Sequence, residues 1–203
     1  METLASREMA DEQERLSGGN VRGSIVRAHL QWVAAYGNQR DWQQLWWGLE
    51  DDIDRAFSGA IDDAGWYPFR WLILLDRAIF RQFGNGVDEH ALFEDLGRFS
   101  ARMHLGPPAI GWPASAHHEF FERSVLLHRE YQDFGQVAYR STGETAGEMI
   151  HSQYPCFSRV YCASAVGYYE QSLMRHGAIK VSVTEETCQC LGWDSCRFAL
   201  RWR

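Results

Sequence analysis

Four residues near the C-terminus, Cys162, Glu185, Cys188 and Cys196, restrict how this chain can fold more than any other feature of the sequence. Three thiols and one carboxylate form a complete ligand set for a tetrahedral Zn²⁺ ion. If all four bind one ion, no position stays open for water or substrate, so the metal would stabilise the fold rather than perform chemistry. The alternative is that the cysteines are small buried apolar residues, as free cysteines often are.

The segments that carry these residues are predicted to lie side by side. Cys162 lies on the apolar face of a helix predicted over residues 155–176. Cys188 follows a strand predicted over residues 179–183, and Cys196 begins a second stretch of strict apolar–polar alternation. The short loop between Cys188 and Cys196 would bring both strand ends next to the helix. A metal ion at this point would join the helix to a hairpin.

The rest of the chain is predicted to be largely helical, on the spacing of its apolar residues and on its Gly, Pro and Asp boundaries. The predicted helices span residues 21–36, 41–57, 69–83, 88–104 and 115–130. A hairpin is predicted around residues 141–143, where Ser-Thr-Gly separates two β-like runs.

These elements predict an α+β fold. Its helical N-terminal two-thirds would pack on a small four-stranded antiparallel sheet, with a long helix between the two hairpins. Residues 1–20 are predicted to be a flexible leader, and residues 21–203 a single domain. That domain would be helical over residues 21–130 and would form the sheet plus helix over residues 131–203.

Composition excludes several classes of function. The net charge of −7 argues against a nucleic-acid-binding face and against a helix that reads anionic lipids. The first residues lack the pattern of a signal peptide, and the longest apolar run, residues 71–75, is too short to span a membrane. Five cysteines without a secretory signal indicate reduced or metal-bound thiols and a cytoplasmic location.

A resemblance to a known family rests on the same C-terminal residues. The run Val183–Phe198 (VTEETCQCLGWDSCRF) resembles the C-terminal signature of the 4-vinyl reductase domain family, and Cys162 and residues 167–170 (Gly-Tyr-Tyr-Glu) lie where that family places them. The resemblance implies a fold shared with core subunits of the TRAPP tethering complex and with haem nitric-oxide-binding domains. The chain is also similar to uncharacterised myxobacterial proteins.

The resemblance also implies a metal site. In vinyl-reductase-type sensor domains of aromatic-responsive transcription activators, one Glu and three Cys bind structural zinc. The matching residues here, at the same spacing, are Glu185, Cys188, Cys196 and Cys162. Haem nitric-oxide-binding domains instead use an axial histidine and a Tyr-x-Ser-x-Arg motif, which this chain lacks. The cofactor expected is therefore structural zinc, with no haem.

Aromatic residues in the helical part and around the predicted sheet are candidates for a ligand pocket, because Tyr and Trp combine an apolar body with a polar group. Core packing is the alternative for each of them. The candidate pocket residues are Trp66, Tyr67, Trp71, His104, Trp112, Phe134, Tyr139, Tyr168 and Tyr169.

The predicted function is a non-enzymatic sensing or carrier module for a small apolar, aromatic or acyl ligand, stabilised by structural zinc. No catalytic residue is predicted, because no pattern pairs a nucleophile with a base. The alternative is a TRAPP-like interaction or scaffold subunit that acts through a homodimer or a partner interface. A homodimer is expected. Cys156 and Cys190 either replace one of the four ligands or are plain thiols.

Overall fold

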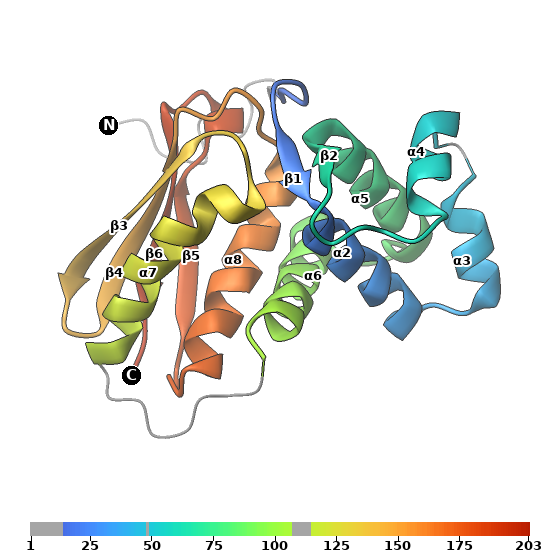
Figure 1. The fold of residues 1–203 in the computed structure, drawn as a ribbon. Helices are drawn as coiled ribbons and strands as arrows, with labels where there is room; N and C mark the ends of the chain where they lie inside the picture. Colours follow the sequence, from blue (N-terminus) through green and yellow to red (C-terminus); the bar gives the residue numbers. More distant parts are fainter. Residues whose placement is uncertain (1–13, 48, 107–114) are drawn as a thin grey trace.

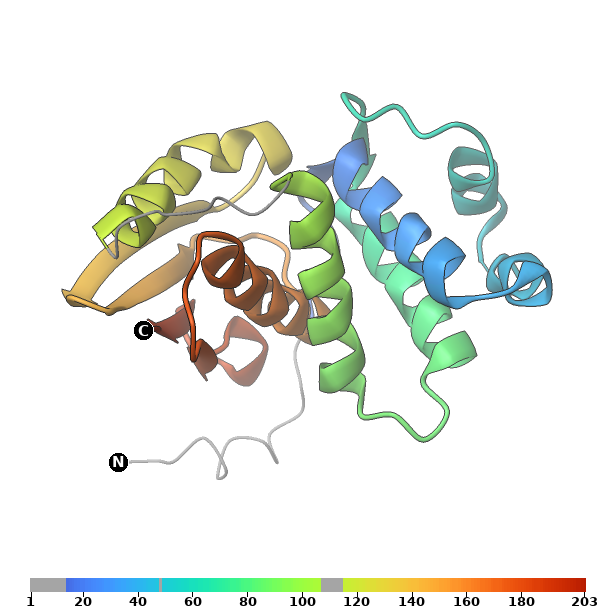
Figure 2. The same ribbon diagram turned by 90° about the horizontal axis from the view of Figure 1, so that it is seen from below.

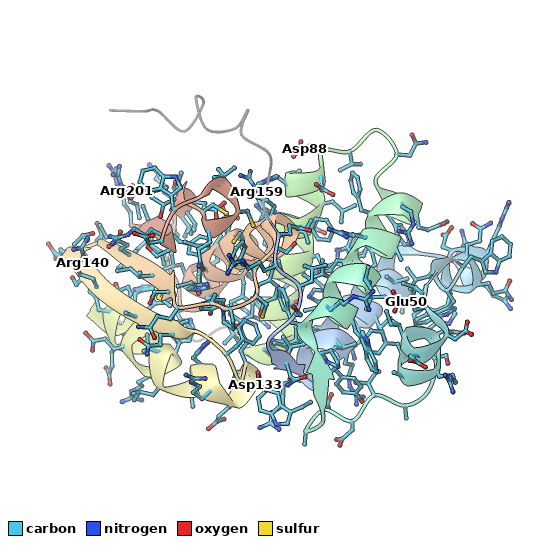
Figure 3. All side chains as sticks on the ribbon, turned by 90° about the horizontal axis from the view of Figure 1, so that it is seen from above. Glu50, Asp88, Asp133, Arg140, Arg159 and Arg201 are labelled. Atoms are coloured by element: carbon cyan, nitrogen blue, oxygen red, sulfur yellow. The ribbon has the colours of Figure 1, made fainter. Side chains whose placement is uncertain are left out.

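A computed structural model describes residues 14–47, 49–106 and 115–203 and confirms the predicted α+β fold class. Helices form one end of the molecule and a four-stranded antiparallel sheet forms the other (Figure 1). Figure 3 shows Glu50 at the helical end and Arg140 and Arg201 at the sheet end. Within the described ranges, no helix is both long enough and apolar enough to cross a membrane.

The helical end is built from five helices and a short pair of strands. The helices are α2 (Gly23–Tyr36), α3 (Gln39–Leu45), α4 (Asp51–Phe57), α5 (Phe69–Phe83) and α6 (Glu89–His104). Strands β1 (Asn20–Arg22) and β2 (Trp66–Pro68) pair in antiparallel fashion. This pairing was not expected, because three-residue strands carry no readable alternation.

The prediction of a single helix over residues 41–57 is wrong, because this segment forms two helices, α3 and α4. The break begins after Leu45, which is buried, and α4 restarts after the extended residue Glu50. α3 itself begins at a capping box, in which the Asn38 side chain accepts from the backbone of Asp41. Leu45 and Ile53 both belong to the core of the helical end.

The sheet contains β3 (Gln136–Gly143), β4 (Ala146–Ser152), β5 (Ser182–Thr187) and β6 (Ser195–Arg201), in the order β3-β4-β6-β5. Helix α8 (Arg159–Arg175) connects β4 to β5, so it lies between the two hairpins as predicted. The strand predicted over residues 179–183 is shifted toward the C-terminus. Ile179 pairs with the backbone of Arg203, but Lys180 has a left-handed φ of 52°, and β5 begins only after it.

Helices α7 (Ser115–Tyr131) and α8 cover the same face of the sheet, and α6 lies on the far side of α8 (Figure 2). From α7, Phe121 stacks on Tyr139 of β3 with ring centroids 5.4 Å apart. From α8, Tyr169 packs edge-on against Phe198 of β6 at 5.6 Å. The two helices are therefore joined to the sheet through aromatic side chains on its inner face.

Two glycines bring α6 and α8 unusually close together. A Cβ atom on Gly97 of α6 would lie 1.9 Å from the carbonyl oxygen of Ser164, and one on Gly167 of α8 would lie 1.8 Å from that of Glu94. Each glycine therefore faces the backbone of the other helix, where no side chain fits. An ion pair between Arg98 and Glu170, 2.6 Å apart, crosses the same interface.

Part of the N-terminal segment predicted to be a leader packs against the domain. The backbone amide of Arg15 donates to the carbonyl of Phe157 over 3.1 Å. The Glu14 carboxylate accepts a hydrogen bond from Ser158, which precedes α8, and pairs with Arg77 of α5. Residues 14–20 thus lie across the junction between the helical end and α8.

Candidate metal centre and ligand cavity

The four predicted metal ligands meet where α8 approaches the hairpin of β5 and β6. Cys162 lies in the first turn of α8, Glu185 in β5, Cys188 just before a short 3₁₀ turn, and Cys196 near the start of β6. One ligand atom from each residue lies within 4.8 Å of all the others. The loop from β5 to β6 turns at Gly192, whose φ of 81° is left-handed and favours glycine.

The sulfur positions match a tetrahedral metal site better than a disulfide. The Cys162 sulfur lies 3.5 Å from that of Cys196 and 3.9 Å from that of Cys188. Zn–S bonds of about 2.3 Å at tetrahedral angles separate two sulfurs by roughly 3.8 Å, whereas a disulfide needs about 2.05 Å. The backbone amide of Gln189 also donates to the Cys196 sulfur over 3.3 Å, the type of outer contact that orients a thiolate ligand.

Without a cation, this cluster cannot hold several negative charges. Burial, with a further contribution from Cys188, raises the pKa of Glu185 to about 8. Its Oε1 is buried and has no hydrogen-bond partner among the described residues. The contact with Cys188 also raises the pKa of Cys162, while that of Cys188 is lowered by its contact with Cys162. A divalent cation would allow all four groups to ionise together.

The remaining two cysteines lie in different places. Cys156 is buried in the hydrophobic core of the helical end, so it lies outside the cluster. Burial raises the pKa of Cys156 to about 12, as for an unreactive structural thiol. Cys190 is buried next to Cys188, and the contact with Cys188 raises the pKa of Cys190.

A cavity of about 690 Å³ is bounded by α2, α6, α7, α8, β3 and β4. Its lining is mainly apolar, and its volume falls within the range of small-molecule sites in proteins. The main apolar contributors are Ile25, Leu105, Phe120, Phe121, Val137 and Met149.

Histidines provide much of the polar lining. His104 donates through Nε2 to the carbonyl of Ser24 over 3.2 Å, and Nε2 of His128 bonds the carbonyl of Phe134 over 3.0 Å. Nε2 of His151 lies 2.5 Å from the hydroxyl of Tyr169. Burial lowers the pKa of His104 and His128, and lowers that of His151 to about 3. These three imidazoles are therefore neutral hydrogen-bonding groups at neutral pH.

The structure distributes the predicted pocket residues over several regions. His104, Tyr168 and Tyr169 line the cavity. Tyr67, Trp71 and Phe134 belong to the core of the helical end. Trp66 is 41% exposed and lies under the guanidinium of Arg22. Tyr139 packs on Phe121 from β3 and hydrogen-bonds His118, and Trp112 lies outside the described residues.

Three cavity histidines, His29, His128 and His151, were not anticipated from the sequence. One signal existed for His29, which lies four residues from both Ile25 and Val33 on the apolar face of α2. A polar residue on an apolar face needs a buried partner or a cavity. No local pattern marks His128 or His151, because the α7 face and the β4 register that orient them depend on tertiary packing.

Comparisons with known proteins give a fold but no sequence family. No protein-family model matches the chain, and no curated protein matches it in sequence. The 4-vinyl reductase and myxobacterial resemblances are therefore not supported by any sequence match.

Solved structures of H-NOX proteins match most of the chain. An H-NOX protein from S. oneidensis in the Fe(II)NO state has a TM-score of 0.62 at 13% identity, covering 90% of this chain and 99% of that one. An Fe(II) unliganded H-NOX mutant from K. algicida has a TM-score of 0.62 at 12% identity, covering 90% and 96%. An oxygen-binding H-NOX domain related to soluble guanylate cyclases has a TM-score of 0.58 at 14% identity, covering 90% and 95%.

These neighbours contradict the expectation of zinc without haem. Their descriptions name Fe(II) ligation states, and one concerns haem redox potential and porphyrin distortion. The missing Tyr-x-Ser-x-Arg motif was therefore no ground for excluding haem from a chain of this fold, and the four-residue cluster shows a possible metal site rather than a bound ion. What the comparisons show is that this chain has the α+β fold of H-NOX proteins.

Proposed function

We propose that this chain is a non-enzymatic small-molecule sensing or carrier module of the 4-vinyl reductase type, and that its ligand occupies the cavity between α6, α7, α8 and the sheet. The observation that carries the proposal is the cavity itself, which combines a volume of about 690 Å³ and apolar walls with a few convergent polar groups. H-NOX proteins of the same fold are described with iron-bound gases. A cytoplasmic location remains part of the proposal.

Haem is one ligand that the described lining fits. The carbonyl of Ser24 holds the Nε2–H of His104, which leaves the other ring nitrogen of His104 with the lone pair that iron needs. Arg123, which pairs with Glu119 one turn earlier on α7, also lines the cavity and would supply a cation for a propionate. A bound haem would supply an iron centre for a diatomic gas; the protein would supply an imidazole, a cation and an apolar enclosure.

A titration tests the proposal. Purified protein should bind either hemin, followed by its Soret band, or the neutral apolar dye N-phenyl-1-naphthylamine, followed by its fluorescence. Ala165 lies on α8 and lines the cavity, so Ala165→Trp should fill it and weaken binding by about tenfold or more. Ala35→Trp is the matched control, because Ala35 is exposed on α2 and lies outside the cavity lining. If neither probe binds the wild-type protein, the cavity is not a ligand site.

We also propose that Cys162, Glu185, Cys188 and Cys196 hold a structural metal ion. The proposal is supported by the convergence of their ligand atoms and by the sulfur separations. This site and the cavity share α8, which carries Cys162 near one end and cavity residues along the rest of its length. The metal would therefore fix the helix that forms one cavity wall.

The alternative of a TRAPP-like interaction subunit rests on exposed apolar side chains. Trp47, Leu126 and Ile179 are 73%, 78% and 66% exposed, and they come from α7 and from two segments outside the helices. Light scattering at several protein concentrations tests the predicted homodimer. A concentration-independent monomer would leave only the ligand-binding proposal.

A further inference from the structure

A buried histidine–carboxylate pair closes the α2 end of the cavity. Nδ1 of His29, on α2, lies 2.6 Å from Oδ1 of Asp76, on α5. The two side chains are 2% and 0% exposed, and the residues are 47 positions apart in sequence. Two polar side chains removed from water at this depth need hydrogen-bond partners.

The pair leaves one ring nitrogen of His29, a residue that lines the cavity, without a hydrogen bond in the described part of the chain. A carboxylate accepts, so Nδ1 of His29 carries a proton and donates to Asp76. For Nε2, at the opposite side of the ring, the described part of the chain offers no hydrogen bond, although the residue lines the cavity. Asp76 makes no second side-chain hydrogen bond there either, since its Oδ2 is buried without a described partner. Asp76 therefore orients the His29 ring and leaves Nε2 to a molecule in the cavity.

The groups around Nε2 restrict what that molecule can be. From α6, His104 lies close enough to interact electrostatically with His29, and Ser100 contributes a hydroxyl. Among the described lining residues, the only Asp, Glu, Lys or Arg side chains are Glu119 and Arg123, and both belong to α7. Glu119 pairs with Arg123, and no carboxylate of the described lining hydrogen-bonds His29. The remaining walls are mostly apolar.

We propose that Nε2 of His29 binds the carboxyl group of an amphipathic carboxylic acid whose apolar body lies along the cavity. A carboxylic acid fits either protonation state of the ring, because the shared proton can lie on the ligand oxygen or on Nε2. An ester has no such proton to donate and carries no charge, so it forms a weaker contact. This inference rests on the proposed ligand-binding function and names the chemical class of the ligand.

The test compares an acid with its own ester. Decanoic acid and methyl decanoate would each displace N-phenyl-1-naphthylamine from the wild-type protein, and the acid should bind about 10- to 100-fold more tightly, as expected for a hydrogen bond to a charged group. His29→Gln and Asp76→Asn should both reduce this preference to about twofold or less. The first removes the ring, and the second removes the negative charge that fixes the proton on Nδ1 of His29, because an asparagine amide can also donate to Nδ1. Asp76 acts here as a positioning residue.

His128→Gln is the matched control, because His128 lines the same cavity from α7 but has its Nε2 bound to a backbone carbonyl. It should keep the acid preference. Ester affinity in each variant reports whether the cavity is intact, and circular dichroism reports folding. If His29→Gln or Asp76→Asn fails to fold, the ratio of acid affinity to ester affinity in the wild-type protein still tests whether the cavity prefers a carboxyl group.

Equal wild-type affinities for acid and ester would overturn the inference and leave the proposed function standing. Failure of both the dye and hemin to bind would overturn both. If only hemin binds, the acid and the ester are compared by displacement of hemin instead. Retention of the full acid preference in a folded His29→Gln protein would place the carboxyl group elsewhere and overturn the assignment of His29.

Discussion

Cys188→Ala and Cys196→Ala should each lower the free energy of unfolding by about 4 kcal/mol or more, because loss of a metal site is among the largest single-residue effects known in proteins. For a domain of this length, that corresponds to a fall in melting temperature of roughly 8 °C or more. Each variant should also lose the bound metal ion. Metal analysis of the wild-type protein should find about one ion per chain, because a four-ligand set is complete for one ion.

Cys156→Ala provides the matched control for these variants. It removes an equally buried sulfur from the core of the helical end, outside the ligand cluster. Its cost should be limited to lost packing, on the order of 1 kcal/mol, with metal content unchanged. A strong chelator should bring the wild-type protein down to the stability of the Cys188 variant. If all three alanine variants melt alike and no ion is found, the cluster is only packing.

Gly97→Ala and Gly167→Ala should each destabilise the protein by about 3 kcal/mol, the upper part of the range for overpacking. The added Cβ atoms would lie 1.9 Å and 1.8 Å from backbone carbonyl oxygens of the facing helix. A backbone oxygen inside a helix cannot rotate away as a side chain can, so α6 and α8 must separate. Thermal and denaturant unfolding of the two variants would measure the loss.

Gly59→Ala separates this effect from the general effect of replacing glycine. A Cβ atom at Gly59 would meet nothing within 4 Å, and no positive φ strains the position. The substitution should change stability by less than about 1 kcal/mol. If Gly97→Ala is as mild as Gly59→Ala, the close crossing of α6 and α8 is not a determinant of stability.

The C-terminal third was predictable because its signals are local. Alternation beginning at Cys196 predicted β6, and the apolar spacing predicted the helix that carries Cys162. The two segments had to meet for the ligand set to be complete, and the ligand atoms do lie together. Strand ends were less accurate: β5 begins three residues later than predicted, because the left-handed conformation of Lys180 interrupts the extended backbone.

The cavity was only partly predictable, since its walls come from distant segments. His104, Tyr168 and Tyr169 were candidates because aromatic and imidazole groups suit pockets in general. The pairing of His29 with Asp76 spans α2 and α5, and no local pattern relates two residues 47 positions apart. The break between α3 and α4 was missed because the helical spacing of Leu45, Leu49, Ile53 and Phe57 continues across it.

The contact between the backbones of α6 and α8 has a consequence for how the cavity accommodates a bound molecule. At Gly97 and Gly167 the two backbones are already in contact, so the helices cannot approach further. The ion pair of Arg98 with Glu170 opposes sliding of one helix along the other. The side of the cavity formed by α6 and α8 is therefore expected to be rigid. The opposite wall, α7, rests on β3 through the stacked rings of Phe121 and Tyr139 and exposes Leu126 at its surface. We therefore expect a ligand that needs more room in the cavity to displace α7 rather than α6 or α8.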